Sequence, residues 1–116
     1  MEQIDWSTLG FGYRKADYNV RCTYKDGKWG ELRVSDSEEV TMHMAATVLH
    51  YGQACFEGLK AFRGKDGKIR VFRMDENAKR MQNSCNTILM QPLPDGLFEE
   101  AVKKVVKLNE HLVPPY

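Results

Sequence analysis

Two stretches in the first two thirds of the chain alternate apolar and polar residues, the period-two pattern of a strand with one buried face. The first stretch comprises residues 18–25 and 28–34, and the second comprises residues 59–63 and 69–73. An Asp-Gly dipeptide lies between the two halves of each stretch, at residues 26–27 and 66–67. Asp-Gly suits the positive φ angles of a type I′ turn. We therefore predict two hairpins that form a small antiparallel sheet.

After residue 74 the apolar spacing changes to that of an amphipathic helix. A helix over about residues 75–89 is predicted, with Asp75 as its N-cap and Glu76 near its positive end. Its apolar stripe comprises Ala78, Met81, Cys85, Ile88 and Leu89. Prolines and a glycine at 92, 94 and 96 then break the chain.

A second helix is predicted to open at Asp95. Its apolar stripe comprises Phe98, Ala101, Val102, Val105, Leu108 or Asn109, and Leu112. The apolar segment from Met44 to Tyr51 fits either a short helix or an irregular strand. Together these patterns predict an α+β fold, with a small antiparallel β-sheet packed against two α-helices.

Length and composition indicate a single folded domain over residues 1–116. Hydrophobic residues make up 42% and charged residues 28% of the chain, which is ordinary for a globular protein. No apolar run approaches the roughly 20 residues that cross a bilayer. The first five residues also lack the basic and apolar regions of a secretory signal. We expect a cytoplasmic protein without a membrane partner.

The positive charge is concentrated in one part of the chain. Residues 60–80 carry a charge of +5, while the remainder carries −4. Such a local excess attracts a small anion such as a phosphate group, and it is equally typical of a solvated hairpin face. The overall balance argues against a nucleic-acid partner, because such proteins usually carry a basic excess over a whole face.

General chemical motifs give little. The sequence has no glycine-rich phosphate loop, no zinc-protease motif and no nucleophile elbow. Its three cysteines are odd in number and widely spaced, which suits neither a disulfide framework nor a zinc site, so we expect buried thiols and no metal. The three histidines are scattered, and we expect them to be structural or solvent-facing.

One ordered set of motifs is far more specific. Residues 50–63 read HYGQACFEGLKAFR, residues 69–73 read IRVFR, and residues 77–81 read NAKRM. This set resembles the branched-chain amino acid aminotransferases, which are class IV pyridoxal-phosphate enzymes. The resemblance covers most of residues 40–116 and is looser before them. It implies the small N-terminal domain of that fold.

The resemblance implies roles for particular residues. Arg80 matches the arginine that binds the cofactor phosphate, a role that suits a permanently charged group with several donors. Tyr51 and Phe56 match aromatic residues of the substrate side-chain pocket, with Tyr51 reaching into the neighbouring subunit of a homodimer. Gly58 matches a position where a missing side chain keeps this pocket open. Phe11 is a further candidate for the pocket. Glu57 and Lys60 belong to the motif without an assigned chemical role, and a structural ion pair is an equal alternative for them.

The activity implied is amino-group transfer between leucine, isoleucine or valine and 2-oxoglutarate, in amino-acid biosynthesis, with pyridoxal phosphate as cofactor. The Schiff-base lysine of this family lies far downstream, and no lysine in the chain matches it. We therefore expect the chain to hold no catalytic residue and to be inactive without the catalytic-lysine domain. The alternatives are another class IV member, a D-amino acid aminotransferase or an aminodeoxychorismate lyase, or a non-catalytic dimerisation or interaction module.

Overall fold

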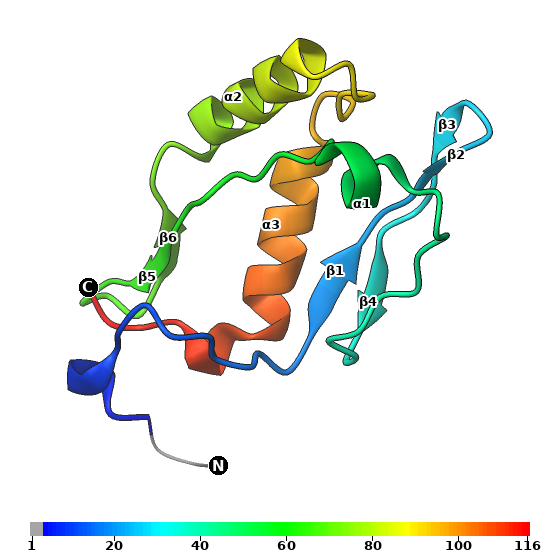
Figure 1. Ribbon diagram of the computed structural model, residues 1–116. Coiled ribbons are helices and arrows are strands. Elements are labelled where there is room, and N and C mark those ends of the chain that lie inside the picture. The colour runs from blue at the N-terminus through cyan, green and yellow to red at the C-terminus, as the bar shows by residue number, and fades with distance from the viewer. Residues whose placement is uncertain (1–3) are drawn as a thin grey trace.

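The computed structural model describes residues 4–116, so the first three residues of the N-terminal segment considered above lie outside it. The α+β class is confirmed (Figure 1). The helices are α1 (Thr47–Tyr51), α2 (Met74–Thr87) and α3 (Leu97–Leu108), with single 3-10 turns η1 (Trp6–Thr8) and η2 (Glu110–Leu112). The strands are β1 (Asn19–Arg21), β2 (Tyr24–Lys25), β3 (Lys28–Trp29), β4 (Arg33–Ser35), β5 (Ala61–Arg63) and β6 (Ile69–Val71). These strands form three separate antiparallel pairs, β1 with β4, β2 with β3, and β5 with β6.

The first predicted hairpin is present but divided by a bulge. Tyr24 pairs with Trp29 near the turn, and Arg21 pairs with Arg33 further down. Two residues on one side therefore face three on the other, the signature of a β-bulge. Asp26 and Gly27 both have positive φ, 53° and 79°, as the predicted type I′ turn requires. The bulge separates this hairpin into two short pairs.

The second hairpin turns differently from the prediction. Gly67 has a φ of 80°, while Asp66 does not adopt a positive φ, so the turn is not type I′. Gly67 instead donates its backbone N–H to the Gly64 carbonyl and Gly64 donates to the Lys68 carbonyl. This pattern matches the three-residue hairpin loop in which a type I turn precedes a glycine bulge. Residues near the C-terminus join the same element, because Arg63 pairs with Pro115 in a parallel bridge.

The helices lie where the periodicity placed them, with shifted ends. Helix α2 is capped by Arg73 in the left-handed conformation, and Asp75 lies inside its first turn instead of capping it. Helix α3 begins after Gly96, whose φ of 86° favours glycine, and not at Asp95. The segment from Met44 to Tyr51, for which the sequence left helix or strand open, is helical over α1.

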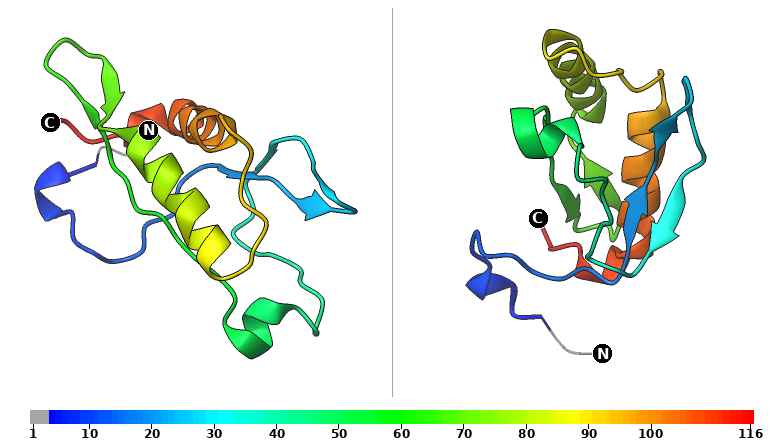
Figure 2. Two further views of the ribbon diagram at one scale, coloured as in Figure 1. Left: turned by 90° about the horizontal axis from the view of Figure 1, so that it is seen from above. Right: turned by 45° about the vertical axis from the view of Figure 1, so that its right-hand side comes forward.

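Helix α3 lies at the centre of the molecule and contacts β1 and α2 (Figures 1 and 2). Its C-terminal end is tied to the first hairpin by Asn109, which occupies the expected apolar stripe but is a buried amide. The Asn109 side chain accepts a hydrogen bond from the Tyr18 N–H and donates to the Tyr18 and Val105 carbonyls. A polar side chain therefore joins the helix to the strand.

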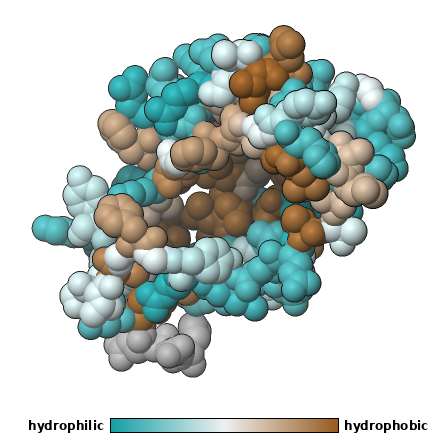
Figure 3. Space-filling model, in the orientation of Figure 1, coloured by the Kyte–Doolittle hydropathy of each residue, from teal (hydrophilic) through white to brown (hydrophobic). Residues whose placement is uncertain are grey.

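The core is smaller than the composition suggests. Among residues 4–116 the buried hydrophobic residues are Ala78 and Cys85 alone. The accessible surface is 9501 Å², whereas a compact monomer of this mass exposes roughly 6,500 Å². The radius of gyration is 15.9 Å, against about 13 Å for a compact domain of this size. Figure 3 shows a hollow at the centre of one face, lined by hydrophobic residues. Apolar surface is thus left open toward solvent.

Asn109→Ala is expected to destabilise the fold by about 2 kcal/mol, because the Tyr18 N–H and carbonyl lose their partner in a buried place. Equilibrium urea unfolding measures the change. The exposed Asn86→Ala, near the end of α2, is the matched control and should shift the free energy of unfolding by less than about 0.5 kcal/mol. Equal effects of the two substitutions would contradict the joining role of Asn109.

Candidate functional site

An extended segment, residues 52–60, runs from the end of α1 to β5 and passes beside α2 (Figures 1 and 2). We call it the linking segment. It carries two of the predicted site residues, Phe56 and Gly58, while α2 carries Arg80. The exposure of its residues alternates: Gln53, Cys55, Glu57 and Leu59 are half-buried, and the intervening residues are exposed. An extended backbone places successive side chains on opposite sides, which explains the alternation.

Side chains of these half-buried residues attach the linking segment to successive turns of α2. Gln53 donates to the Ile88 carbonyl at the end of the helix, with a distance of 2.9 Å. The Cys55 sulfur lies 3.6 Å from that of Met81 and 3.7 Å from that of Cys85. Cys85 is a buried thiol as predicted, whereas Cys22 and Cys55 are half-buried, so the prediction of three buried thiols is wrong for these two. Asn77 donates to the Gly58 carbonyl at 3.1 Å. The segment therefore follows the helix with a contact at almost every turn.

The strongest of these contacts is an ion pair between Glu57 and Arg80. The Arg80 Nε donates to both carboxylate oxygens, at 2.7 and 2.9 Å, and Nη2 donates to Oε1 as well. Asn77 adds a hydrogen bond to the same oxygen at 3.3 Å. The Glu57 side chain is only 3% exposed, while that of Arg80 is 67% exposed. The carboxylate is thus on the inside of the pair and the guanidinium on the outside.

The pair fixes the charge state of both groups. Hydrogen bonds from Arg80 lower the pKa of Glu57 below its ordinary value and outweigh the burial that raises it. Hydrogen bonding to Glu57 in turn raises the pKa of Arg80. Both residues are therefore charged at neutral pH, and Arg80 remains a permanent cation.

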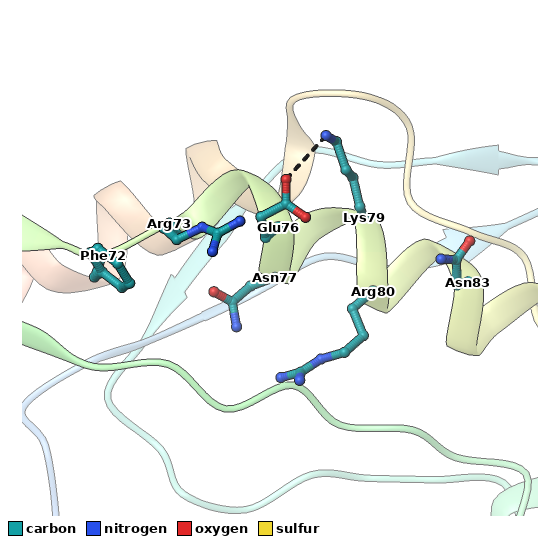
Figure 4. A pocket seen from close by; sticks show the side chains of 7 residues that line it. All are labelled: Phe72, Arg73, Glu76, Asn77, Lys79, Arg80 and Asn83. Atoms are coloured by element: carbon teal, nitrogen blue, oxygen red, sulfur yellow. Dashed lines mark hydrogen bonds and ion pairs between the residues drawn. The ribbon is translucent and has the colours of Figure 1, made fainter.

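Arg80 opens onto a groove of about 540 Å³ along one side of α2. Figure 4 shows its side chain extending away from Lys79 and toward the linking segment. The groove is lined by Phe72, Arg73, Glu76, Asn77, Lys79, Arg80 and Asn83. Three of these residues are basic and one is acidic, and Glu76 is paired with Lys79 at 3.3 Å. A groove of this charge suits a small anion.

The other predicted site residues are spread over three places. Phe56 is 90% exposed on the side of the linking segment that faces away from α2, and Tyr51 at the end of α1 is 85% exposed. A side chain added at Gly58 would meet no described atom within 4 Å, so packing within this part of the chain does not require glycine there. Phe11 lines a separate groove that it shares with Lys60 and Phe62. Phe56 and Gly58 flank Glu57, the partner of Arg80, in the chain, but the Phe56 side chain points away from Arg80. Tyr51 and Phe11 lie apart from this pair.

The sequence analysis gave Glu57 no chemical role and left a structural ion pair open, and it named Asn77 only as part of a motif. The structure places Glu57 in an ion pair with Arg80. Residues 53–59 read QACFEGL, which has no period-two pattern, so the sequence alone did not place Glu57. In the structure the alternation of exposure puts Glu57 on the same side as Cys55, where a buried carboxylate needs a cationic partner such as Arg80. Asn77 likewise carries no distinguishing pattern in the sequence.

Residues 4–116 contain no cluster of three histidine, cysteine or acidic side chains arranged to hold a metal ion. No helix described for these residues has the length and apolar character needed to traverse a membrane.

Comparison with known proteins finds relatives along the whole chain. It is 47% identical over 116 residues to the branched-chain-amino-acid aminotransferase of Haemophilus influenzae, and 44% identical over 116 residues to that of Helicobacter pylori. It is 41% identical over 114 residues to branched-chain-amino-acid transaminase 1 of Bacillus subtilis. The chain spans only about a third of the length of these relatives, with 34%, 34% and 32% covered. No protein-family model matches the chain.

The Glu57–Arg80 pair should make stability depend on acid. Because the pKa of Glu57 is lowered in the folded state, its contribution is complete above the ordinary value of 4.5 and is lost as the pH falls through the folded value. Between pH 5 and pH 3 the unmodified protein should therefore lose more stability than Glu57→Gln. Urea midpoints at the two pH values measure this difference.

Glu76→Gln is the matched control, because its pair with Lys79 is exposed and such pairs contribute little. The Glu76→Gln variant should lose nearly as much stability between pH 5 and pH 3 as the unmodified protein. If Glu57→Gln shows the same loss between pH 5 and pH 3 as the unmodified protein, the folded pair does not hold the carboxylate charged.

Proposed function

Because the whole chain is homologous to the N-terminal third of branched-chain-amino-acid aminotransferases, we propose that it is the N-terminal part of such an enzyme and helps to bind its cofactor and substrate. The full-length protein then transfers the amino group between leucine, isoleucine or valine and 2-oxoglutarate. The observation that carries the proposal is the partly exposed Arg80 at a basic groove, in a chain that is homologous over its whole length to such enzymes.

The residues along α2 fit the phosphate of pyridoxal phosphate. A phosphate dianion needs several donors and positive charge, and guanidinium supplies both. The hydrogen bonds to Glu57 use Nε and Nη2 of Arg80, which leaves the Nη1 amino group directed elsewhere. Arg73 and Lys79 add positive charge to the same groove. When bound, the cofactor supplies the electron sink of amino-group transfer.

Phe56, Tyr51, Gly58 and Phe11 are assigned to the substrate side. The first two are exposed aromatic residues, 90% and 85%, and large rings in contact with water are costly unless something covers them. An apolar wall of this kind suits a branched aliphatic side chain. Phe56 is joined directly to Glu57, so its backbone is held by the contacts of the linking segment with α2.

The proposal assigns the covalent cofactor lysine to the remainder of the full-length protein, and the 116 residues alone are then inactive. The open surface supports this division, since 9501 Å² exceeds what a compact chain of this mass exposes. We also propose a homodimer formed partly through the exposed apolar residues, and a cytoplasmic location. Sedimentation of the full-length protein and cell fractionation test these two points.

Arg80→Ala in the full-length protein should weaken the binding of pyridoxal phosphate by about 10- to 100-fold, because a charge-assisted contact to phosphate is lost. Titration followed by cofactor absorbance measures the dissociation constant. Lys79→Ala is the control, since Lys79 lies next to Arg80, is exposed and is paired with Glu76. Similar losses in both variants would show that only the general positive potential of the groove matters.

Phe56→Ala should lower kcat/KM for leucine by about tenfold and change that for alanine much less, because a hydrophobic wall contributes roughly 1–3 kcal/mol of discrimination. Steady-state kinetics with the two amino acids measures the ratio. Met44→Ala removes a similarly exposed apolar side chain outside the linking segment and is the control. An equal loss for leucine and alanine would exclude Phe56 from the side-chain pocket.

A further inference from the structure

We infer that Glu57 is a positioning residue for Arg80, which holds the guanidinium in the orientation that receives the cofactor phosphate. The inference rests on the proposed role of Arg80 and gives a function to a motif residue that the comparison with the aminotransferases leaves without one. The evidence for the inference is the set of atoms that join Glu57 to Arg80, together with the burial of Glu57 and the exposure of Arg80.

The pair uses one edge of the guanidinium. Nε contacts both carboxylate oxygens and Nη2 contacts one of them. Guanidinium is planar, so a carboxylate held against the Nε and Nη2 edge fixes the direction of the adjacent edge, which is formed by Nη1 and the second hydrogen of Nη2. That adjacent edge is a second fork of donors, which matches the geometry of a phosphate. Arg80 therefore engages Glu57 with one edge and presents the other.

Burial separates the roles of the two partners. The Glu57 side chain is 3% exposed and is also held by Asn77, so it is an anchor, whereas Arg80 is 67% exposed and can meet a ligand. A carboxylate that competed with the phosphate for Arg80 would lie on the exposed side of the guanidinium. Glu57 instead lies behind it, between the linking segment and α2.

The energetic benefit is preorganisation. A free arginine on a helix surface has many rotamers, and a ligand that selects one of them loses affinity. Because the pair already restricts Arg80, the phosphate does not need to order it. The groove also remains positive after the pair is formed, since Arg73 and Lys79 outnumber Glu76.

The test compares pyridoxal phosphate with pyridoxal, which lacks the phosphate, in the full-length protein. Glu57→Gln keeps the size of the side chain but replaces one acceptor oxygen with an amino group that faces the guanidinium donors. It should weaken the binding of pyridoxal phosphate about tenfold, the lower end of what loss of an orienting partner costs at metal sites, and leave pyridoxal unchanged. Absorbance titration gives both dissociation constants.

Two more variants separate orientation from general structure. Asn77→Ala removes the second support of Glu57 together with the hydrogen bond to the Gly58 carbonyl, and should give a smaller loss with the same preference for the phosphate form. In an Arg80→Ala background, Glu57→Gln should cause no further loss, because Glu57 acts through Arg80. Glu76→Gln serves as the control for removing one acidic charge from the groove.

The outcomes distinguish the two proposals. If Arg80→Ala leaves the preference for pyridoxal phosphate over pyridoxal intact, the proposed role of Arg80 fails. If Arg80→Ala removes that preference but Glu57→Gln does not, only the positioning role fails. Tighter binding of pyridoxal phosphate by Glu57→Gln would show that Glu57 competes with the phosphate and would overturn the inference. Equal weakening of both cofactor forms would reduce Glu57 to a structural role.

Discussion

The attachment of the linking segment to α2 is the constraint on which the candidate site depends. The segment has no strand partner over residues 52–60, so its position is set by side chains that reach the helix. The Gln53, Cys55 and Glu57 contacts follow one another along α2, and the ion pair of Glu57 with Arg80 is the most polar of them. The same contacts that hold the segment also orient the arginine and fix the backbone beside Phe56.

The open shape gives this local order its importance. With Ala78 and Cys85 as the buried hydrophobic residues of the described chain, a large core does not rigidify the site. Order comes instead from polar contacts between elements, such as the Asn109 bridge to Tyr18 and the ion pair on α2. Polar contacts of this kind are directional, so they specify an arrangement more than they add stability.

Local patterns in the sequence were enough for the hairpins, for α2 and for α3, because period two and period 3.6 are properties of neighbouring residues. The ends of the helices were predicted less well. Asp75 has the chemistry of an N-cap, yet the left-handed Arg73 precedes the helix. The single sheet was also an overestimate, since the bulge after Trp29 divides the first hairpin and the second pairs with the C-terminal residues. These features depend on geometry that no short pattern records.

In the candidate site, too, the sequence predicts some features and only the three-dimensional structure reveals the others. Arg80 could be proposed from the motif, but its partner lies 23 residues away, and only the path of the linking segment brings the two together. That separation also has an evolutionary consequence. A buried carboxylate without its cation carries an uncompensated cost, and the exposed Arg80 without Glu57 loses the partner that orients it. Glu57 and Arg80 therefore constitute one unit of selection, in which drift at either position is blocked until the other changes with it.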